Sequence, residues 1–281
     1  MTHSRSVFVL LFLLFASNSV TAQEATTTAA NWYTKKTDWH GFQQFYFQCA
    51  DSQCYLIKPN NSLPGNPWIW RARFPSFHAE MDVTLVGKGF HLAYMDVANQ
   101  FGCPNVIERA DVFYNELVNK HDLNEKAVME GVSRGGLFVY NWTAQHPDRV
   151  ARIYCDTPVM DFRSWPGGKG SGIGHAGSWQ NCLKAYGLTE EQAATYDKLP
   201  INYAQIIAKS NIPVMHIVSE NDRVVPPTEN TYVLRDKLKS LGQEMQVIVV
   251  PEGTEKSNGH HFTHPEPQRV VDFIMQTHSE S

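Results

Sequence analysis

Several features that would indicate other classes of protein are scarce or missing in this chain of 281 residues. It has five cysteines and no Cys-x-x-Cys pair, which argues against a zinc ribbon, a thioredoxin-like redox site or a cysteine-framework fold. It has no run of lysines and arginines and a formal net charge of −4, so no nucleic acid partner is expected. Beyond the N-terminal region, no apolar stretch approaches the roughly 20 residues needed to cross a bilayer.

The N-terminal region has the pattern of a secretory signal peptide. Arg5 precedes an apolar run at 7–16, and Val20 and Ala22 are the small residues expected at the −3 and −1 positions of a cleavage site. We therefore predict that residues 1–22 are removed and that the protein is secreted or periplasmic, with no membrane contact after cleavage. A retained membrane anchor is the alternative. Because Arg5 is the one charged residue of this segment, its removal changes the formal net charge from −4 to −5.

The rest of the chain alternates between strand-like and helix-like patterns. A loose leader rich in Thr and Ala, at 23–40, precedes a predicted antiparallel hairpin formed by 42–48 and 55–58. Cys49 and Cys54 flank the turn of this hairpin, where they could form a disulfide. Further strands are predicted at 68–70, 91–97, 127–129, 150–155, 212–218 and 245–250. Helices are predicted at 79–86, 106–118, 135–146, 230–241 and 268–277.

Strands that alternate with helices at this spacing predict the α/β fold class. We expect a mostly parallel central sheet flanked by helices, with the hairpin adding antiparallel strands at one edge. The segment 161–199 breaks the alternation and is rich in Gly, Trp and polar residues, so it is predicted to be a small cap inserted between two strands. Residues 41–281 would then form a single domain.

The sequence Gly131-Val132-Ser133-Arg134-Gly135 lies between a predicted strand and a predicted helix. A serine at such a sharp turn is held in a strained conformation, and glycines two residues to either side let the turn close. The hydroxyl of Ser133 would then lie at the carboxyl edge of the sheet, and the backbone N–H of Arg134 could face a developing oxyanion. The pattern alone is common by chance, but its position between a strand and a helix indicates a nucleophile.

A serine becomes a good nucleophile when a histidine accepts its proton and an acid orients that histidine. Asp222 lies in the loop that follows the predicted strand 212–218, where an acid at the edge of the sheet belongs. It is therefore the predicted acid of the site. Asp161, which follows the preceding strand, is the competing candidate.

The predicted base lies in the polar loop after the strand 245–250. His260 is preferred because it directly follows a glycine, and His261 is the alternative base. Together with His264 these residues could instead bind a metal ion, but no matching acidic or histidine partner is evident elsewhere in the sequence. No metal and no organic cofactor is therefore predicted.

The motifs GVSRGG, ENDRVVPP and NGHH resemble those of the α/β-hydrolase superfamily, in which nucleophile, acid and base follow one another in this order. The resemblance covers nearly the whole chain after residue 22. The phrases WIWRARF, HLAYMDVANQFG, EGVSRGGLFVYNW and WPGGKGSG are similar to exported bacterial hydrolases that are usually described as carbohydrate esterases. The resemblance implies an α/β-hydrolase fold and a serine esterase, with acetyl or methyl esters on polysaccharide as the favoured substrate.

The same resemblance implies where the oxyanion is bound. The loop after Trp70 takes the place of the HGGG-type oxyanion loop, although this chain has Arg-Ala-Arg there. Ala72 is the expected second backbone donor beside Arg134, and Arg73 is the alternative.

Three arginines and two tryptophans are candidate substrate-binding residues. Arg71, Arg73 or Arg134 could pair with an anionic substrate group such as a uronate, or could form structural ion pairs instead. Trp165 and Trp179 in the predicted cap could stack on sugar rings, or could simply seal the cap.

Two other functions have to be weighed against ester hydrolysis. A serine peptidase of the prolyl-oligopeptidase type usually needs a large gating domain, for which this chain is not expected to have room. A non-catalytic carbohydrate-binding module on the same scaffold is disfavoured because the Ser, Asp and His set is complete. The sequence specifies no oligomeric state.

Overall fold

The computed structural model describes Met1 and residues 31–279, apart from the side chains of 277–279. The predicted signal peptide, apart from Met1, and residues 23–30 of the predicted leader lie outside the described residues. The compact unit that carries all the helices and strands of the described chain is Trp32–Ser281. None of the described helices combines the length and the apolar character needed to cross a membrane.

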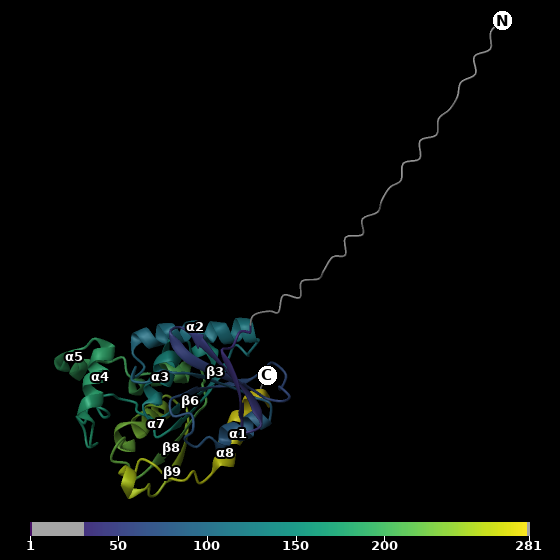
Figure 1. The fold of residues 1–281 in the computed structure, drawn as a ribbon. Coiled ribbons are helices and arrows are strands. Elements are labelled where there is room, and N and C mark those ends of the chain that lie inside the picture. The colour runs from purple at the N-terminus through teal and green to yellow at the C-terminus, as the bar shows by residue number, and fades with distance from the viewer. Residues whose placement is uncertain (2–30, 280–281) are drawn as a thin grey trace. The chain divides into compact units, whose positions relative to one another are not determined.

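One sheet runs through this unit, with the strand order β1-β2-β3-β5-β4-β6-β7-β8-β9 (Figure 1). Its strands are β1 (Lys35–Trp39), β2 (Phe42–Cys49), β3 (Ser52–Lys58), β4 (Trp68–Ala72), β5 (His91–Met95), β6 (Ala127–Val132), β7 (Val150–Asp156), β8 (Val214–Ser219) and β9 (Gln246–Val250). The pairs from β1 to β5 are antiparallel, and all pairs from β5 to β9 are parallel. The predicted α/β-hydrolase fold, with antiparallel strands at one edge, is confirmed.

The last residues of the predicted loose leader form an edge strand, so that prediction is wrong from residue 35 onward. In β1, Lys35 pairs with Tyr46 and Trp39 pairs with Phe42. The sequence KKTDW has no apolar alternation because its side chains are largely exposed. Charged residues are typical of edge strands, where they oppose pairing with another chain.

The structure does not form the disulfide considered for the hairpin. Cys54 lies opposite Phe47, and Cys49 lies opposite Ser52, so the two cysteines are not cross-strand partners. All five cysteines are free thiols. Burial raises the pKa of the Cys54 thiol.

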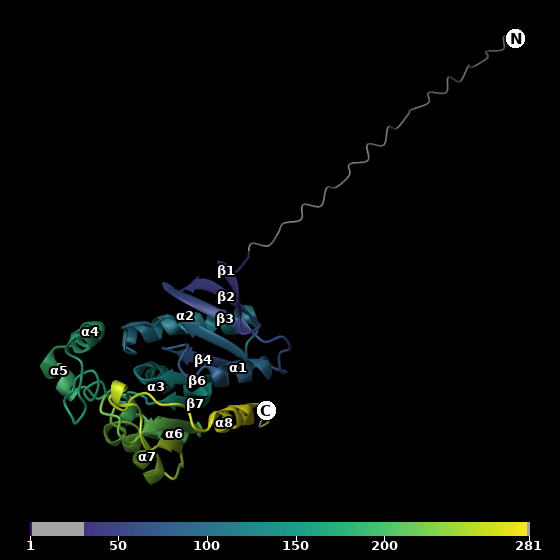
Figure 2. The same ribbon diagram turned by 60° about the horizontal axis from the view of Figure 1, so that its bottom comes forward.

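Helices cover both faces of the sheet (Figure 2). They are α1 (Glu80–Gly87), α2 (Pro104–His121), α3 (Gly135–Gln145), α4 (Ala176–Tyr186), α5 (Glu190–Thr195), α6 (Ala204–Lys209), α7 (Thr231–Ser240) and α8 (Pro267–Ser279). Apolar side chains of α2, α3, α6 and α7 form one core with the sheet, and those of α1 and α8 form a second core. Because the helices cover the two faces of the sheet, the loops at the carboxyl ends of the parallel strands are the place where a site is expected.

The predicted cap falls in the long connection between β7 and β8. Its helices α4 and α5 lie beyond the main helical layers (Figure 2). They have a small core of their own, in which Phe162, Trp179 and Leu183 pack with Phe101 and Leu137. Since Leu137 belongs to α3, this core joins the insertion to the helix that follows Ser133.

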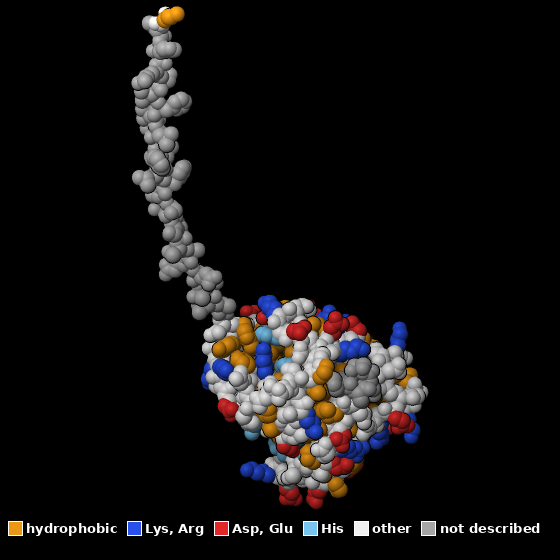
Figure 3. Space-filling model, turned by 90° about the vertical axis from the view of Figure 1, so that its right-hand side faces the viewer, with side chains coloured by type: hydrophobic (Ala, Val, Ile, Leu, Met, Phe, Trp, Pro, Cys, Tyr) orange, Lys and Arg blue, Asp and Glu red, His pale blue; other side chains and the backbone are white. Residues whose placement is uncertain are grey.

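Charges of both signs are spread over one face of the molecule. On the face shown in Figure 3, Lys and Arg side chains lie among those of Asp and Glu instead of gathering in a patch of one sign. This distribution gives no support to a nucleic-acid-binding face there.

Candidate active site

Ser133 occupies the turn between β6 and α3 in a left-handed backbone conformation, with φ of 51°. Such a φ is rare for a residue other than glycine and is typical of a strained nucleophile turn. The N–H of Ser133 donates to the carbonyl of Asp156 at 2.8 Å, and its own carbonyl accepts from the N–H groups of Gly136 and Val159 at 3.0 and 2.9 Å. The bonds to Asp156 and Val159 hold the turn against β7 and the chain beyond it, at the carboxyl edge of the sheet.

The two flanking glycines permit close approach. A Cβ on Gly135 would overlap the carbonyl oxygen of Ala72 in β4. A Cβ on Gly131 would lie 3.0 Å from Val139 Cγ2 and 3.1 Å from Cys155 Sγ. Neither glycine has a positive φ, so what the turn requires here is the absence of a side chain.

We expect Gly135→Ala to impair the site more than it impairs the fold. The added methyl must push β4 away from α3, and overpacking of this kind costs about 1–3 kcal/mol. A shift of about 1 Å in the reacting groups lowers kcat/KM by roughly 100-fold. The test is to measure hydrolysis and thermal melting together. Gly177→Ala in α4 is the matched control, because the nearest atom there is a His175 ring atom at 3.6 Å; equal losses in both variants would contradict the prediction.

Ser133, His260 and Asp222 form a hydrogen-bonded relay. The Ser133 hydroxyl donates to His260 Nε2 at 3.0 Å, and His260 Nδ1 donates to Asp222 Oδ2 at 2.7 Å. The other carboxylate oxygen, Oδ1, accepts the N–H groups of Val224 and Val225 at 2.8 and 2.9 Å. The acid is thus held by its own loop, and the imidazole presents its free nitrogen lone pair to the serine.

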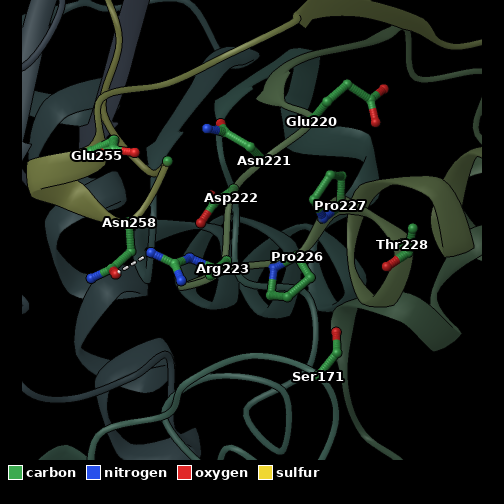
Figure 4. A pocket seen from close by; sticks show the side chains of 11 residues that line it. Ser171, Glu220, Asn221, Asp222, Arg223, Pro226, Pro227, Thr228, Glu255 and Asn258 are labelled. Atoms are coloured by element: carbon green, nitrogen blue, oxygen red, sulfur yellow. Dashed lines mark hydrogen bonds between the residues drawn. The ribbon is translucent and has the colours of Figure 1, made fainter.

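The loops that carry acid and base are tied together. Arg223 donates from its backbone N–H to the carbonyl of Asn258, and from Nη2 to Asn258 Oδ1, both at 2.9 Å (Figure 4). Asn221 and Gly253 exchange two further hydrogen bonds, of 3.2 and 2.7 Å. These bonds set the position of Asp222 relative to His260. A cavity of about 570 Å³ lies beside the acid loop, and Figure 4 draws its lining side chains. Asp222 lines this cavity, but Ser133 and His260 do not.

The competing candidates lie elsewhere or make other contacts. Asp161 forms a bidentate ion pair with Arg163, with bonds from 2.7 to 3.1 Å. His261 lies beside the His260 ring, and burial lowers its pKa, but it bonds to neither Ser133 nor Asp222. His264 is hydrogen bonded to Tyr154 at 3.1 Å. In the described chain no three His, Cys, Asp or Glu side chains are grouped so that they could hold a metal ion.

The serine and the histidine open into a cavity of about 370 Å³. Its lining is mainly apolar and aromatic, and no lining residue among those described carries a carboxylate. The lining residues are Phe74, Ser76, Phe77, Val132, Ser133, Arg134, Thr157, Trp165, Val224, His260 and His261. Such a cavity suits a small acyl or alkyl group beside the nucleophile.

The structure does not bring Ala72 to this cavity. Ala72 is the last residue of β4, is 1% exposed and pairs with Gly131. The chain then turns through Arg73 and Phe74, which have positive φ values of 66° and 45°, and Phe74 lines the cavity. The backbone N–H groups of Arg134 and Phe74 make no hydrogen bond within the described residues, so both are available to an oxyanion.

Arg71 forms structural ion pairs, which the sequence left open as the alternative to binding substrate. It is fully buried, and its Nη1 contacts Asp82 at 2.6 Å and Glu130 at 2.8 Å. Its Nη2 donates to the carbonyls of Phe74, at 3.0 Å, and Phe77. Arg71 therefore holds the loop 73–78, which contains Phe74 and Phe77 of the cavity lining, and is not available to substrate. The sequence feature that indicates this role is a single charged residue within an otherwise apolar strand, as in β4 and β6.

His78 anchors the same loop from its other end. Its Nδ1 bonds to Asp156, and its Nε2 bonds to the carbonyl of Phe262 at 2.8 Å. Burial lowers the pKa of His78, but the hydrogen bond and the charge of Asp156 outweigh this, so the pKa is raised above its ordinary value. The loop is thereby joined to β7 and to the chain just after His260.

The predicted substrate-binding side chains divide into two groups. Trp165 lines the cavity. Trp179 does not: it is 5% exposed, packs against Phe162 and donates from Nε1 to Glu190 at 2.6 Å. Arg73 does not line the cavity either, and its Nη1 lies 3.7 Å from Asp96 Oδ1.

Comparison with solved structures shows the same fold in enzymes of two kinds. A puromycin-hydrolyzing peptidase of Mycobacterium tuberculosis matches 85% of this chain and 40% of its own length, at 16% identity and a TM-score of 0.64. An acylaminoacyl peptidase of Pyrococcus horikoshii matches 86% of this chain and 41% of its own length, at 17% identity and a TM-score of 0.61. Carboxyl esterase 2 of Tuber melanosporum matches 86% of this chain and 87% of its own length, at 16% identity and a TM-score of 0.58.

The chain spans about two fifths of the length of the two peptidases. No curated protein sequence matches it. The family model described as the prolyl oligopeptidase family matches residues 85–279, which include Ser133, Asp222 and His260. The chain therefore belongs to the prolyl oligopeptidase family, a family of serine hydrolases.

Proposed function

We propose that this protein hydrolyses carboxylic esters by acyl transfer to Ser133, with acetyl or methyl esters on polysaccharide outside the cytoplasm as its substrates. The observation that carries the proposal is the relay from Asp222 through His260 to Ser133, with 2.7 and 3.0 Å bonds, at the wall of a small cavity. Nucleophile, base and orienting acid are the parts that this chemistry needs.

In the proposed mechanism His260 takes the proton of Ser133 as Oγ attacks the ester carbonyl carbon. The resulting oxyanion is stabilised by the N–H of Arg134 and by that of Phe74, which replaces Ala72 as the second donor. Collapse of the intermediate breaks the bond to the alcohol oxygen, which receives the proton from His260. Water, activated by the same histidine, then releases the acid and restores Ser133.

Peptide hydrolysis is the second candidate, because the family and two of the structural relatives are peptidases. The lining of the cavity favours the ester. A site for the free amino end of a peptide needs an acceptor for its ammonium group, usually a carboxylate. The described lining offers the cation Arg134 and no carboxylate. The match to the carboxyl esterase over most of both chains is in keeping with this choice.

Fluorophosphonate labelling tests the activated serine. We expect the purified protein to be labelled and Ser133→Ala to remain unlabelled with a thermal melt close to that of the wild type, because the change removes one half-buried hydroxyl. Acetate and methanol release from esterified polysaccharides, beside cleavage of amino-acid 4-nitroanilides, would then distinguish esters from amides. Cleavage of anilides alone would replace the ester proposal with the peptidase. Labelling that persists in Ser133→Ala would contradict the assignment of the nucleophile.

A further inference from the structure

Arg134 differs from its neighbouring arginines in having no acidic partner among the described residues. Arg71 is paired with Asp82 and Glu130, and Arg73 lies near Asp96. Within the described chain Arg134 forms no ion pair, and the one hydrogen bond of its guanidinium joins Nη1 to Asn99 Oδ1 at 3.0 Å. Half-buried arginines are normally paired with a carboxylate or a phosphate, because desolvation of an unpaired charge is costly.

Aromatic rings hold this guanidinium in place. Its central carbon lies 5.5 Å from the centre of the Phe74 ring, 5.6 Å from that of Trp165 and 5.8 Å from that of Phe101. Phe74 and Trp165 both line the cavity that contains Ser133. Cation–π contacts of this kind fix the plane of the guanidinium, so little side-chain entropy is lost when an anion binds to it.

The surroundings favour an anion as the missing partner. Burial and the nearby charge of Arg73 lower the pKa of Arg134, so its cationic form is destabilised until a negative group approaches. No described residue of the cavity lining competes for it. A planar carboxylate is the group that a guanidinium fork binds in bidentate fashion.

We propose that Arg134 forms an anion subsite and that the preferred substrates are acyl esters whose alcohol part carries a carboxylate, as in an acylated uronate sugar. This inference rests on the proposed ester hydrolysis and narrows its substrate class. The carboxylate pairs with the guanidinium between Phe74 and Trp165, while the ester carbonyl lies at Ser133. Arg134 thus contributes twice, with its backbone N–H to the oxyanion and with its side chain to substrate selection.

A pair of nearly isosteric acetates tests the subsite. We expect kcat/KM for 3-acetoxybenzoate to exceed that for 3-acetoxybenzamide by about tenfold or more, because a charge-assisted bond is lost in the amide. Arg134→Gln should bring this ratio close to one, and Arg134→Lys, which cannot bind in bidentate fashion, should leave an intermediate ratio. Arg235→Gln, which makes the same charge change at an exposed side chain of α7, should keep the wild-type ratio. A ratio that survives Arg134→Gln, or is lost in Arg73→Gln instead, overturns the proposal.

Binding to Ser133→Ala separates this inference from the proposed function. Calorimetry should show tighter binding of 3-acetoxybenzoate than of 3-acetoxybenzamide, and the difference should vanish when Arg134→Gln is added. That result supports the subsite even if no ester is turned over, in which case ester hydrolysis alone is overturned. Equal binding of the two compounds overturns the subsite, whatever the turnover.

Discussion

His260→Ala is expected to lower kcat by roughly 10⁴- to 10⁶-fold, because triad members act as a unit and the loss of the base alone removes most of their effect. His260 is the residue that bonds to both Ser133 and Asp222. The fold should survive, since the ring lies at the cavity and not in either main core. Steady-state kinetics on an acetyl ester, with thermal melting of the same samples, measures both effects.

His261→Ala is the matched control, because the neighbouring histidine lines the same cavity and is the alternative base from the sequence. It should change kcat/KM by no more than about tenfold, or about 1.4 kcal/mol. The reverse result, a large loss in His261→Ala and a small one in His260→Ala, would show that the relay is formed by the other ring. Equal large losses would indicate that the loop, rather than one imidazole, had been disturbed.

Arg71→Met is expected to destabilise the protein by about 3–5 kcal/mol, a large share of the roughly 5–15 kcal/mol that stabilises a typical domain. The change leaves Asp82 and Glu130, which are 1% and 2% exposed, without their cation. It also frees the carbonyls of Phe74 and Phe77, so activity should fall under conditions where the protein is still folded. Urea unfolding gives the loss of stability. Arg235→Met, at an exposed ion pair, should cost less than about 1 kcal/mol.

Glu130→Gln should be tolerated far better than Arg71→Met. Burial raises the pKa of Glu130 well above its ordinary value; the charge of Arg71 opposes this shift, and that of Asp82 adds to it. The folded chain therefore keeps a proton that the unfolded chain releases above about pH 4.3. The free energy of unfolding falls as the pH rises from there to the raised pKa of Glu130 in the folded chain. The neutral amide of Glu130→Gln has no proton to lose. The free energy of unfolding of this variant should therefore rise relative to that of the wild type as the pH increases. If the difference in the free energy of unfolding between the variant and the wild type stays constant with pH, Glu130 is ionised in the folded protein and the prediction is wrong.

The parts of the fold that depend on repeating patterns were accessible from the sequence. Buried strands such as β6 and β8 are mostly apolar, and α2 carries an apolar stripe, so the sequence pattern predicts them. The edge strand β1 was not predicted, because a sequence of exposed, charged side chains resembles that of a loop. The turn at Ser133 was recognisable because its chemistry is local to five residues.

Contacts between distant segments were not accessible in this way. The preference for His260 over its neighbour came from one adjacent glycine, whereas the structure distinguishes them by contacts with Ser133 and Asp222, which are 127 and 38 residues away. The proposed second oxyanion donor, Phe74, lies two residues beyond the expected Ala72, because the chain turns at Arg73 and Phe74, which have positive φ values although neither is a glycine. The sequence left Arg71 open between a substrate contact and a structural ion pair, because its partners Asp82 and Glu130 lie 11 and 59 residues further along the chain.

The strand order also has a consequence for when activity can arise during synthesis. Ser133 follows the central strand β6, whereas His260 follows β9, an edge strand that pairs with β8 alone. A chain leaving the ribosome thus completes its nucleophile turn 127 residues before its base is made. Until β9 has paired with β8, His260 is not in place to accept the proton of Ser133. An incompletely folded chain therefore lacks the activated serine. Hydrolase activity therefore depends on the completed edge of the sheet as well as on the residues of the site.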